Sequence, residues 1–321
     1  MKYPLLHETL KVGSSVLKNR LVMPPMATEK SAKGQVTDGL IAYYGDMARS
    51  GPGLIIQEHS FVSPDGRASA NQVSLAADAD IPGLQRLTAA VHAQGVPILA
   101  QISHAGSAAH RAITGQEVIS ASAVPNPSRA ASVHGQPEFP REMTQGDIQC
   151  IIQAFVDAAA RAQQAGYDGV EIHSAHGYLL DQFYSPLTNR RTDDYTGRTL
   201  EGRTRLQVEI IQAIRRRLGK DFVLSLRLGG SDYSQTLEGT GMIIDHPLQT
   251  GIIGSGNIRP HGMRSDRYKI QLFFGSLKCR THVAMTVGYV TMIMQISPEI
   301  LQITGRGHDF LSCGSSLLTC R

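Results

Sequence analysis

The sequence predicts an α/β protein with the architecture of a (β/α)8 barrel. Up to about Gly230, short apolar segments alternate with longer segments of helical periodicity, and glycine-bounded turns separate them. Such alternation is typical of a parallel sheet whose strands are joined by helices. No G-x-G-x-x-G segment follows the first apolar run, which argues against an open dinucleotide-binding sheet. The 321 residues suit one barrel domain, and we expect a single domain over 1–321.

Five strands and four helices make up the regular part of this expected barrel. Glycines follow three of the helices, at Gly51, Gly95 and Gly166, where a helix end favours glycine. The expected strands are 21–23, 53–57, 97–101, 169–173 and 222–228. The expected helices are 38–50, 83–94, 147–165 and 201–218. A loop rich in Ser, Pro and Ala over 120–140 is too long for a plain connection, so we interpret it as a lid or substrate-facing loop.

The composition argues against several classes of protein. A net charge of +4 without a run of five or six basic residues disfavours nucleic-acid binding. No stretch approaches the roughly 20 apolar residues of a membrane span, and the N-terminus lacks the apolar core of a signal peptide. Four cysteines without C-x-x-C spacing disfavour a zinc ribbon or an iron–sulfur cluster. We expect a cytoplasmic protein without a nucleic-acid or membrane partner, and a homo-oligomer is left open.

The segment Gly169–Leu180 delivers the densest set of polar side chains. An apolar strand ends there in His173, His176 and Tyr178. Two imidazoles and a phenol at this spacing can hold a carbonyl or anionic oxygen and supply a proton. Barrel enzymes place their chemistry just past the carboxyl ends of the strands. The sequence therefore predicts an active site here.

Other polar side chains are expected at the same mouth of the barrel. They are Glu58 and His59 after the second strand, Gln101 and His104 after the third, and Arg227 at the end of the fifth. The set contains no pair of carboxylates, which disfavours glycoside hydrolysis. A guanidinium and an amide suit a planar, partly anionic ring with many hydrogen-bonding atoms, and a reduced flavin is such a ring.

Five blocks of the sequence resemble, in order, the Old Yellow Enzyme family of FMN-dependent ene-reductases. The blocks are 17–26 (LKNRLVMPPM), 53–58 (GLIIQE), 100–106 (AQISHAG), 169–180 (GVEIHSAHGYLL) and 185–195 (SPLTNRRTDDY), and together they span about residues 1–233. The resemblance implies a TIM barrel that binds FMN at its C-terminal mouth. It also implies that NAD(P)H reduces this FMN. It further implies hydride transfer from flavin N5 to the activated C=C bond of an α,β-unsaturated carbonyl compound.

The resemblance implies roles for the matched residues. Those expected to bind the cofactor are Pro25, Met26, Ala27 and His59 against the flavin ring, Gln101 at its pyrimidine edge, and Arg227 near N1 and the ribityl chain. His173 and His176 would hold the carbonyl oxygen of a small enone-type substrate. Tyr178 would protonate its α-carbon.

Other interpretations of these residues stay open. His173 and His176 could be the metal pair of a TIM-barrel hydrolase, although no third ligand is evident and we expect no metal. His104 is expected to be structural and Glu58 to cap a loop. The segment 189–193 is expected to form a structural turn.

The C-terminal third departs from the family pattern. After about Ser234 the alternation of strands and helices is lost, although strands six to eight would have to come from 234–321. The segment 253–260 is the nearest match to the loop after strand six. The segments 287–289 and 304–306 are the nearest matches to the loops that would bind the FMN phosphate through backbone N–H groups.

Two explanations of residues 234–321 compete. They are either a divergent closure of the barrel or the product of a reading-frame change or a degraded gene. The abrupt loss of pattern favours the second explanation, and a family-like tail in another frame of the coding DNA would support it. The alternative function is then a catalytically impaired family member with a defective barrel closure, because unpaired strand edges invite aggregation and loss of the phosphate loops would weaken FMN binding.

Overall fold

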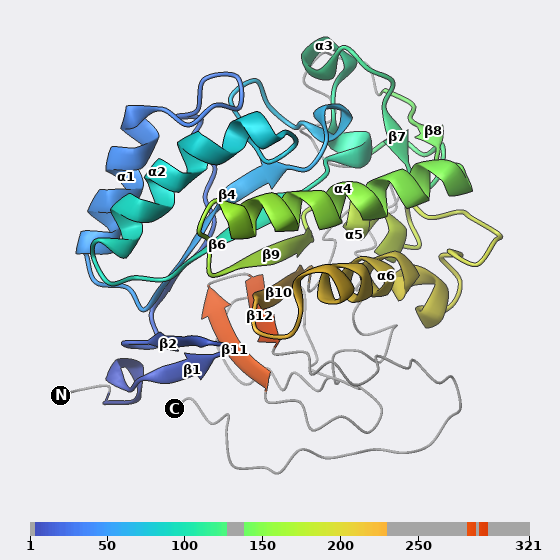
Figure 1. Ribbon diagram of the computed structural model, residues 1–321. Helices are drawn as coiled ribbons and strands as arrows, with labels where there is room; N and C mark the ends of the chain where they lie inside the picture. The colour runs from blue at the N-terminus through green and yellow to red at the C-terminus, as the bar shows by residue number, and fades with distance from the viewer. Residues whose placement is uncertain (1–3, 127–137, 230–280, 287–288, 295–321) are drawn as a thin grey trace, which may run out of the picture.

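The computed structural model describes residues 4–126, 138–229, 281–286 and 289–294 (Figure 1). In the first two of these ranges the chain forms an α/β half-barrel. The fold class expected from the sequence is confirmed for this part of the chain.

Five parallel strands form the half-barrel in the order in which they occur in the chain. They are β3 (Val22–Met23), β4 (Leu54–Phe61), β6 (Ile98–Ser103), β9 (Gly169–Ser174) and β10 (Val223–Leu228). Each strand pairs in parallel with the next, and the short β5 (Val73–Ser74) pairs with β4. Consecutive parallel strands joined by crossovers are the building pattern of a (β/α)8 barrel.

Four long helices lie along one face of this sheet (Figure 1). They are α1 (Asp38–Arg49), α2 (Ile81–His92), α4 (Gln145–Gln164) and α6 (Leu200–Leu218). Three of them begin at a threonine, namely Thr37, Thr144 and Thr199. Each threonine hydroxyl accepts a hydrogen bond at 3.1 Å from the N–H three residues later. These caps satisfy backbone donors that the first helical turn leaves open, so the sequence itself fixes where the helices start.

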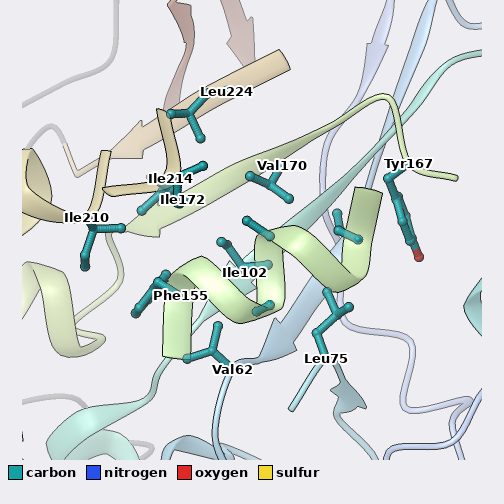
Figure 2. Close-up of a cluster of buried hydrophobic side chains, with 14 of the residues drawn as sticks. Val62, Leu75, Ile102, Phe155, Tyr167, Val170, Ile172, Ile210, Ile214 and Leu224 are labelled. Carbon is teal, nitrogen blue, oxygen red and sulfur yellow. The ribbon is translucent and has the colours of Figure 1, made fainter. Parts of the chain in front are cut away.

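The main core lies between the sheet and the helices (Figure 2). Val170 and Ile172 of β9 and Leu224 of β10 join one apolar cluster with Phe155 of α4 and Ile210 of α6. Side chains alternate along a strand, so the intervening residues of β9 and β10 lie on the opposite face. That opposite face is the inner face of the half-barrel.

A hairpin of β1 (Leu10–Val12) and β2 (Ser15–Leu17) covers the amino-terminal end of the inner face. The turn uses Gly13, whose φ of +58° suits glycine. The apolar cluster under the hairpin contains Val12, Leu17, Leu54, Ile56, Leu99 and Val223. The inner face is therefore apolar near the hairpin, and its polar side chains lie toward the carboxyl ends of the strands.

Shorter elements complete the described part. They are the 3-10 segments η1 (Pro4–His7), η2 (Pro64–Gly66), η3 (Asp78–Asp80) and η4 (Gly106–Ala108), the short helices α3 (Arg111–Thr114) and α5 (Leu179–Tyr184), and the strands β7 (Ile119–Ser120) and β8 (Arg141–Glu142). β7 pairs with β8, which joins the two ends of the long loop expected over 120–140. Residues 127–137 lie outside the described part, so the lid interpretation stays a prediction.

All five expected strands and all four expected helices are present, with shifted ends. The largest shift is in β4, which continues past residue 57 to Phe61. Its register against β6 changes between Gln57 and Ser60, which marks a β-bulge. His59 therefore lies inside a bulged strand instead of following it. Bulges of this kind often aim side chains at active sites.

Beyond β10 the sheet continues with an antiparallel pair. β12 (Tyr289–Met294) pairs antiparallel with β10, and β11 (Thr281–Thr286) pairs antiparallel with β12. A regular barrel would place a parallel sixth strand beside β10, so the parallel pattern ends there in the described part. The expected loops at 253–260 and 304–306, like the rest of the expected strands six to eight, lie outside the described residues.

None of the helices in the described part of the chain is both long enough and apolar enough to cross a membrane.

Candidate active site

Three buried side chains form a row at the centre of the inner face. The strand register places Gln101 of β6, Glu171 of β9 and Ser225 of β10 side by side. Gln101 Nε2 donates a hydrogen bond to Glu171 Oε1 at 2.7 Å, and Ser225 Oγ donates to Glu171 Oε2 at 3.2 Å. Each of the three residues is at most 2% exposed. The Glu171 carboxylate thus draws the amide nitrogen of Gln101 toward itself and fixes the orientation of that amide.

A second row lies one step closer to the carboxyl ends of the strands. It pairs His173 of β9 with Arg227 of β10, and both side chains are buried. Burial raises the pKa of Glu171 to about 7, while the Gln101 hydrogen bond and the positive charge of Arg227 oppose that rise. The charge at the centre of the inner face therefore changes near neutral pH.

His173 and His176 face each other through their ring nitrogens. His173 Nε2 and His176 Nδ1 are 3.3 Å apart, and the ring centroids are 4.9 Å apart. His176 and Gly177 have φ values of +62° and +72°, and this left-handed turn follows directly from the end of β9. Strain at a non-glycine residue of this kind is typical of functional sites.

Both histidines are neutral at pH 7. Burial, followed by the nearby His176, His59 and Arg227, lowers the pKa of His173 well below its usual value. Partial burial, followed by the charges of Arg227 and His59, lowers the pKa of His176 to about 4. A neutral imidazole carries one N–H donor, so the pair can hold an oxygen atom without a fixed positive charge.

Tyr178 stands beside this pair at the N-terminus of α5. Its ring lies edge-on to His173 with centroids 5.1 Å apart and is 5.6 Å from the ring of His59. Burial, followed by the charge of Glu29, raises the pKa of Tyr178 to about 12. The phenol therefore keeps its proton throughout the neutral range and can act as a proton donor.

The hydrogen bonds of Gln72 fix the tautomer of His59. The backbone N–H of Ala68 donates to Gln72 Oε1 at 2.7 Å, so the Nε2 amide group of Gln72 is the one that faces His59 Nδ1, at 3.1 Å. His59 Nδ1 must then accept, and the ring proton lies on Nε2. Burial lowers the pKa of His59 to about 4, so this imidazole is also neutral at pH 7.

The first loop after β3 is anchored to β4. The N–H and the hydroxyl of Thr28 donate to the two carboxylate oxygens of Glu58 at 2.9 and 2.7 Å. The expectation that Glu58 caps a loop is confirmed. The loop carries Pro25, Met26 and Ala27, and the Met26 side chain is exposed, with a relative exposure of 62%. Their predicted contacts with flavin stay predictions.

His104 and the segment 189–193 were also expected to be structural, and both make hydrogen bonds of a structural kind. His104 is buried, and its Nδ1 accepts from the N–H of Gly106 at 3.0 Å. The Asn189 amide donates to the backbone carbonyls of Phe183 in α5 and of Tyr195 at 2.7 Å each. Asp193 binds Arg191 through both carboxylate oxygens.

The structure brings together most of the residues predicted from the sequence. The rings of His59, His173, His176 and Tyr178 form one cluster through the contacts above. Gln101 hydrogen-bonds to Glu171, whose pKa responds to the charge of Arg227.

Sequence reasoning missed two residues of this site, Glu171 and Gln72. Glu171 could have been found from the period-two pattern of its strand, because it precedes His173 by two positions and shares its face. Gln72 lies in an irregular segment, and no local pattern marks it.

The metal interpretation finds no support in the described part of the chain. No three His, Cys, Asp or Glu side chains are close enough there to hold a metal ion.

The inner face fits the pyrimidine edge of a flavin. Gln101 has its amide nitrogen bound to Glu171, so its amide oxygen is the group left to accept from a ring N–H. Arg227 adds a cation of the kind that stabilises negative charge on a reduced flavin. The segments expected to bind the phosphate lie outside the described residues, apart from Tyr289 of β12.

Comparisons with known proteins show which family the chain resembles. A model of the NADH:flavin oxidoreductase / NADH oxidase family matches residues 5–247. An NADH oxidase of Thermoanaerobacter brockii is 43% identical over 234 residues, which are 72% of this chain and 35% of that protein. An NADPH dehydrogenase of Clostridium acetobutylicum is 37% identical over 227 residues, which are 70% of this chain and 64% of that protein. The chain thus spans about a third of the first relative and less than two thirds of the second.

Solved structures show the same fold. The Old Yellow Enzyme homologue of Zymomonas mobilis matches with a TM-score of 0.70 at 30% sequence identity, over 78% of this chain and 68% of that one. Morphinone reductase matches with a TM-score of 0.65 at 30% identity, over 75% of this chain and 64% of that one.

Proposed function

The chain belongs to the NADH:flavin oxidoreductase / NADH oxidase family, the Old Yellow Enzyme family, and on that premise we propose that it is an FMN-dependent NAD(P)H oxidoreductase. The proposed reaction is reduction of the activated C=C bond of a small α,β-unsaturated carbonyl compound. FMN reduced by NAD(P)H would supply the hydride. The observation that carries the proposal is the cluster of neutral histidines and a protonated tyrosine above the Gln101–Glu171 pair.

In this proposal His173 and His176 bind the substrate oxygen. Hydride addition to an enone develops negative charge on the carbonyl oxygen, and fixed N–H donors stabilise that charge. Both imidazoles are neutral, because burial and Arg227 are among the causes that lower their pKa values. A neutral pair of imidazoles needs no bound counter-ion, so the substrate can bind to it without displacing one.

Tyr178 supplies the proton in this proposal. Its pKa of about 12 keeps the hydroxyl protonated, and the enolate carbon that would accept the proton is a strong base. His173 lies edge-on to the same ring, so the carbonyl-binding pair and the proton donor share one small volume.

Gln101 and Arg227 would hold the pyrimidine edge of the ring. Glu171 fixes the Gln101 amide and lies within electrostatic reach of Arg227, so it is a positioning residue for both. The anchored loop with Pro25, Met26 and Ala27, together with His59, would complete the flavin contacts.

One observation favours a second candidate, a family member with impaired activity. The strand beside β10 runs antiparallel in β12, where a regular barrel has a parallel sixth strand. Such a chain would keep the inner-face residues and lack a working phosphate site.

The absorbance spectrum of the purified chain, after incubation with FMN and desalting, separates the two candidates. A retained flavin band that NADPH or NADH bleaches, and that cyclohexenone restores, supports the oxidoreductase. Colourless protein that is nonetheless folded by circular dichroism supports the impaired member and overturns the first candidate.

A further inference from the structure

A cavity in the segment between α5 and α6 is lined by four arginines. Its volume is about 520 Å3, and the arginines are Arg190, Arg191, Arg198 and Arg203. Within the described part of the chain, no acidic residue lines it. None of its lining residues belongs to the histidine and tyrosine cluster.

Among the residues that the structure describes, an acid neutralises only one of the four arginines, Arg191. Arg191 Nε donates to Asp193 Oδ1 at 3.0 Å, and its Nη2 donates to Asp193 Oδ2 at 2.5 Å. Arg191 also donates to two backbone carbonyls, so it is part of the wall. Arg190, Arg198 and Arg203 have no ion pair with any described residue, so the described lining of the cavity carries an excess of positive charge.

Arg203 is the most informative of these residues because it is buried. It is 6% exposed, and its buried Nε has no hydrogen-bond partner among the described residues. A guanidinium remains charged in a protein, and a buried charge without a partner is costly. An anion in the cavity would remove that cost.

The surrounding backbone is tightly packed and adds to the positive potential. A Cβ at Gly197 would lie 2.3 Å from the carbonyl oxygen of Asn189, so the backbone at Gly197 is in close contact with the backbone at Asn189. Arg203 lies in the first turn of the 19-residue helix α6, after the cap at Thr199. The N-terminal end of a helix attracts negative charge.

We propose that this cavity binds the phosphate or diphosphate group of a small phosphorylated molecule. Arginine guanidinium groups match phosphate oxygens with paired hydrogen bonds, and three arginines are available for them. The volume lies within the range of about 300–1,000 Å3 typical of small-molecule sites. This proposal does not depend on the flavin or on the proposed reaction.

Titration of the flavin-free protein with sodium pyrophosphate by isothermal calorimetry tests the site. Wild-type protein should bind it saturably with one equivalent. Arg203→Met should weaken binding at least tenfold, and Arg190→Ala should weaken it by a smaller factor. Arg205→Met is the matched control, because Arg205 lies on the same helix and is bound to the Asp194 carbonyl; its affinity should stay within twofold of wild type.

The melting temperature, measured with and without pyrophosphate, provides an independent test. Arg203→Met removes a buried charge that no described residue pairs with, so its melting temperature should equal or exceed that of wild type. Pyrophosphate should raise the melting temperature of wild type and leave that of Arg203→Met unchanged. A lower melting temperature, together with no saturable binding by wild type, would show that Arg203 pairs with an acid of its own chain and would overturn the proposal.

Titrations with ADP and inorganic phosphate, and with the other arginine variants, test the proposal further. Tighter binding of ADP than of inorganic phosphate would point to a nucleotide as the source of the phosphate group, and the reverse order to a free anion. Equal pyrophosphate affinity in wild type and Arg203→Met contradicts the site. If Arg203→Met does not fold, Arg190→Ala and Arg198→Ala decide, and unchanged affinity in both overturns the proposal.

Discussion

Glu171 decides which end of the Gln101 amide is free to meet a ligand. The two side chains come from neighbouring strands and are joined by a hydrogen bond of 2.7 Å from Gln101 Nε2 to Glu171 Oε1. Rotation of the amide by half a turn would set two oxygens against each other in a site from which water is excluded. Glu171 therefore acts on any bound ring through Gln101, although it does not itself need to touch that ring.

We expect Glu171→Gln to weaken FMN binding about tenfold, or about 1.4 kcal/mol. A glutamine offers one acceptor oxygen, so it cannot accept from both Gln101 and Ser225 as the carboxylate does. Quenching of FMN fluorescence at pH 8 measures the affinity. Asp157→Asn on α4 is the control and should bind as wild type does. Equal affinity in Glu171→Gln would contradict the positioning role.

The same variant predicts a difference in how stability depends on pH. The pKa of Glu171 is raised from 4.5 to about 7, so the folded state holds this proton more tightly than the unfolded state. The stabilisation is fully present below about pH 4.5 and is lost as the pH rises through about 7. The free energy of unfolding should therefore fall over this range by up to about 3 kcal/mol more in wild type than in Glu171→Gln.

Urea unfolding of flavin-free protein at pH 5, 6, 7 and 8 measures that difference. Contributions from other titrating groups, including His59, cancel when the two proteins are compared. Parallel pH profiles for wild type and variant would show that Glu171 has an ordinary pKa in the folded state.

Local sequence signals predicted the helices and the parallel strands because those elements carry their own boundaries. Thr144 caps α4 through the N–H of Asp147, and Gly166 follows its end. The β1–β2 hairpin was missed because each strand has three residues and Val16 is 64% exposed, so no clear alternation of apolar residues results. Its position depends on contacts with Leu54 and Val223, which are remote in sequence.

The candidate site likewise contains residues that local sequence signals predicted and residues that they missed. His173, His176 and Tyr178 were predictable because six consecutive residues contain them all. The roles of Glu171 and Gln72 arise from partners on other segments, since 70 residues separate Glu171 from Gln101. The antiparallel pairing of β12 with β10 also had no local signal, because a strand's sequence does not state the direction of its neighbour.

We expect His59 to carry its ring proton on Nε2. The Gln72 amide nitrogen faces His59 Nδ1 at 3.1 Å, and the Ala68 N–H prevents the amide from turning over. Nitrogen-15 NMR of the histidine side chains at pH 7 reports the tautomer directly. Gln72→Leu should give a mixture of the two tautomers, whereas Gln94→Leu at an exposed position should leave the spectrum unchanged. A proton on Nδ1 in wild type would contradict the hydrogen-bond assignment.

The last prediction separates proton donation from flavin chemistry. Tyr178→Phe keeps the ring against His173 and removes only the hydroxyl, whose pKa of about 12 holds the proton at neutral pH. In stopped-flow measurements on flavin-loaded protein, reoxidation by cyclohexenone should slow by about 10² to 10⁴, the usual contribution of a positioned acid. Reduction by NADPH should be nearly unchanged, because that half-reaction needs no proton from Tyr178. Tyr43→Phe on α1 is the control, and equal slowing of both half-reactions in Tyr178→Phe would exclude the proton-donor role.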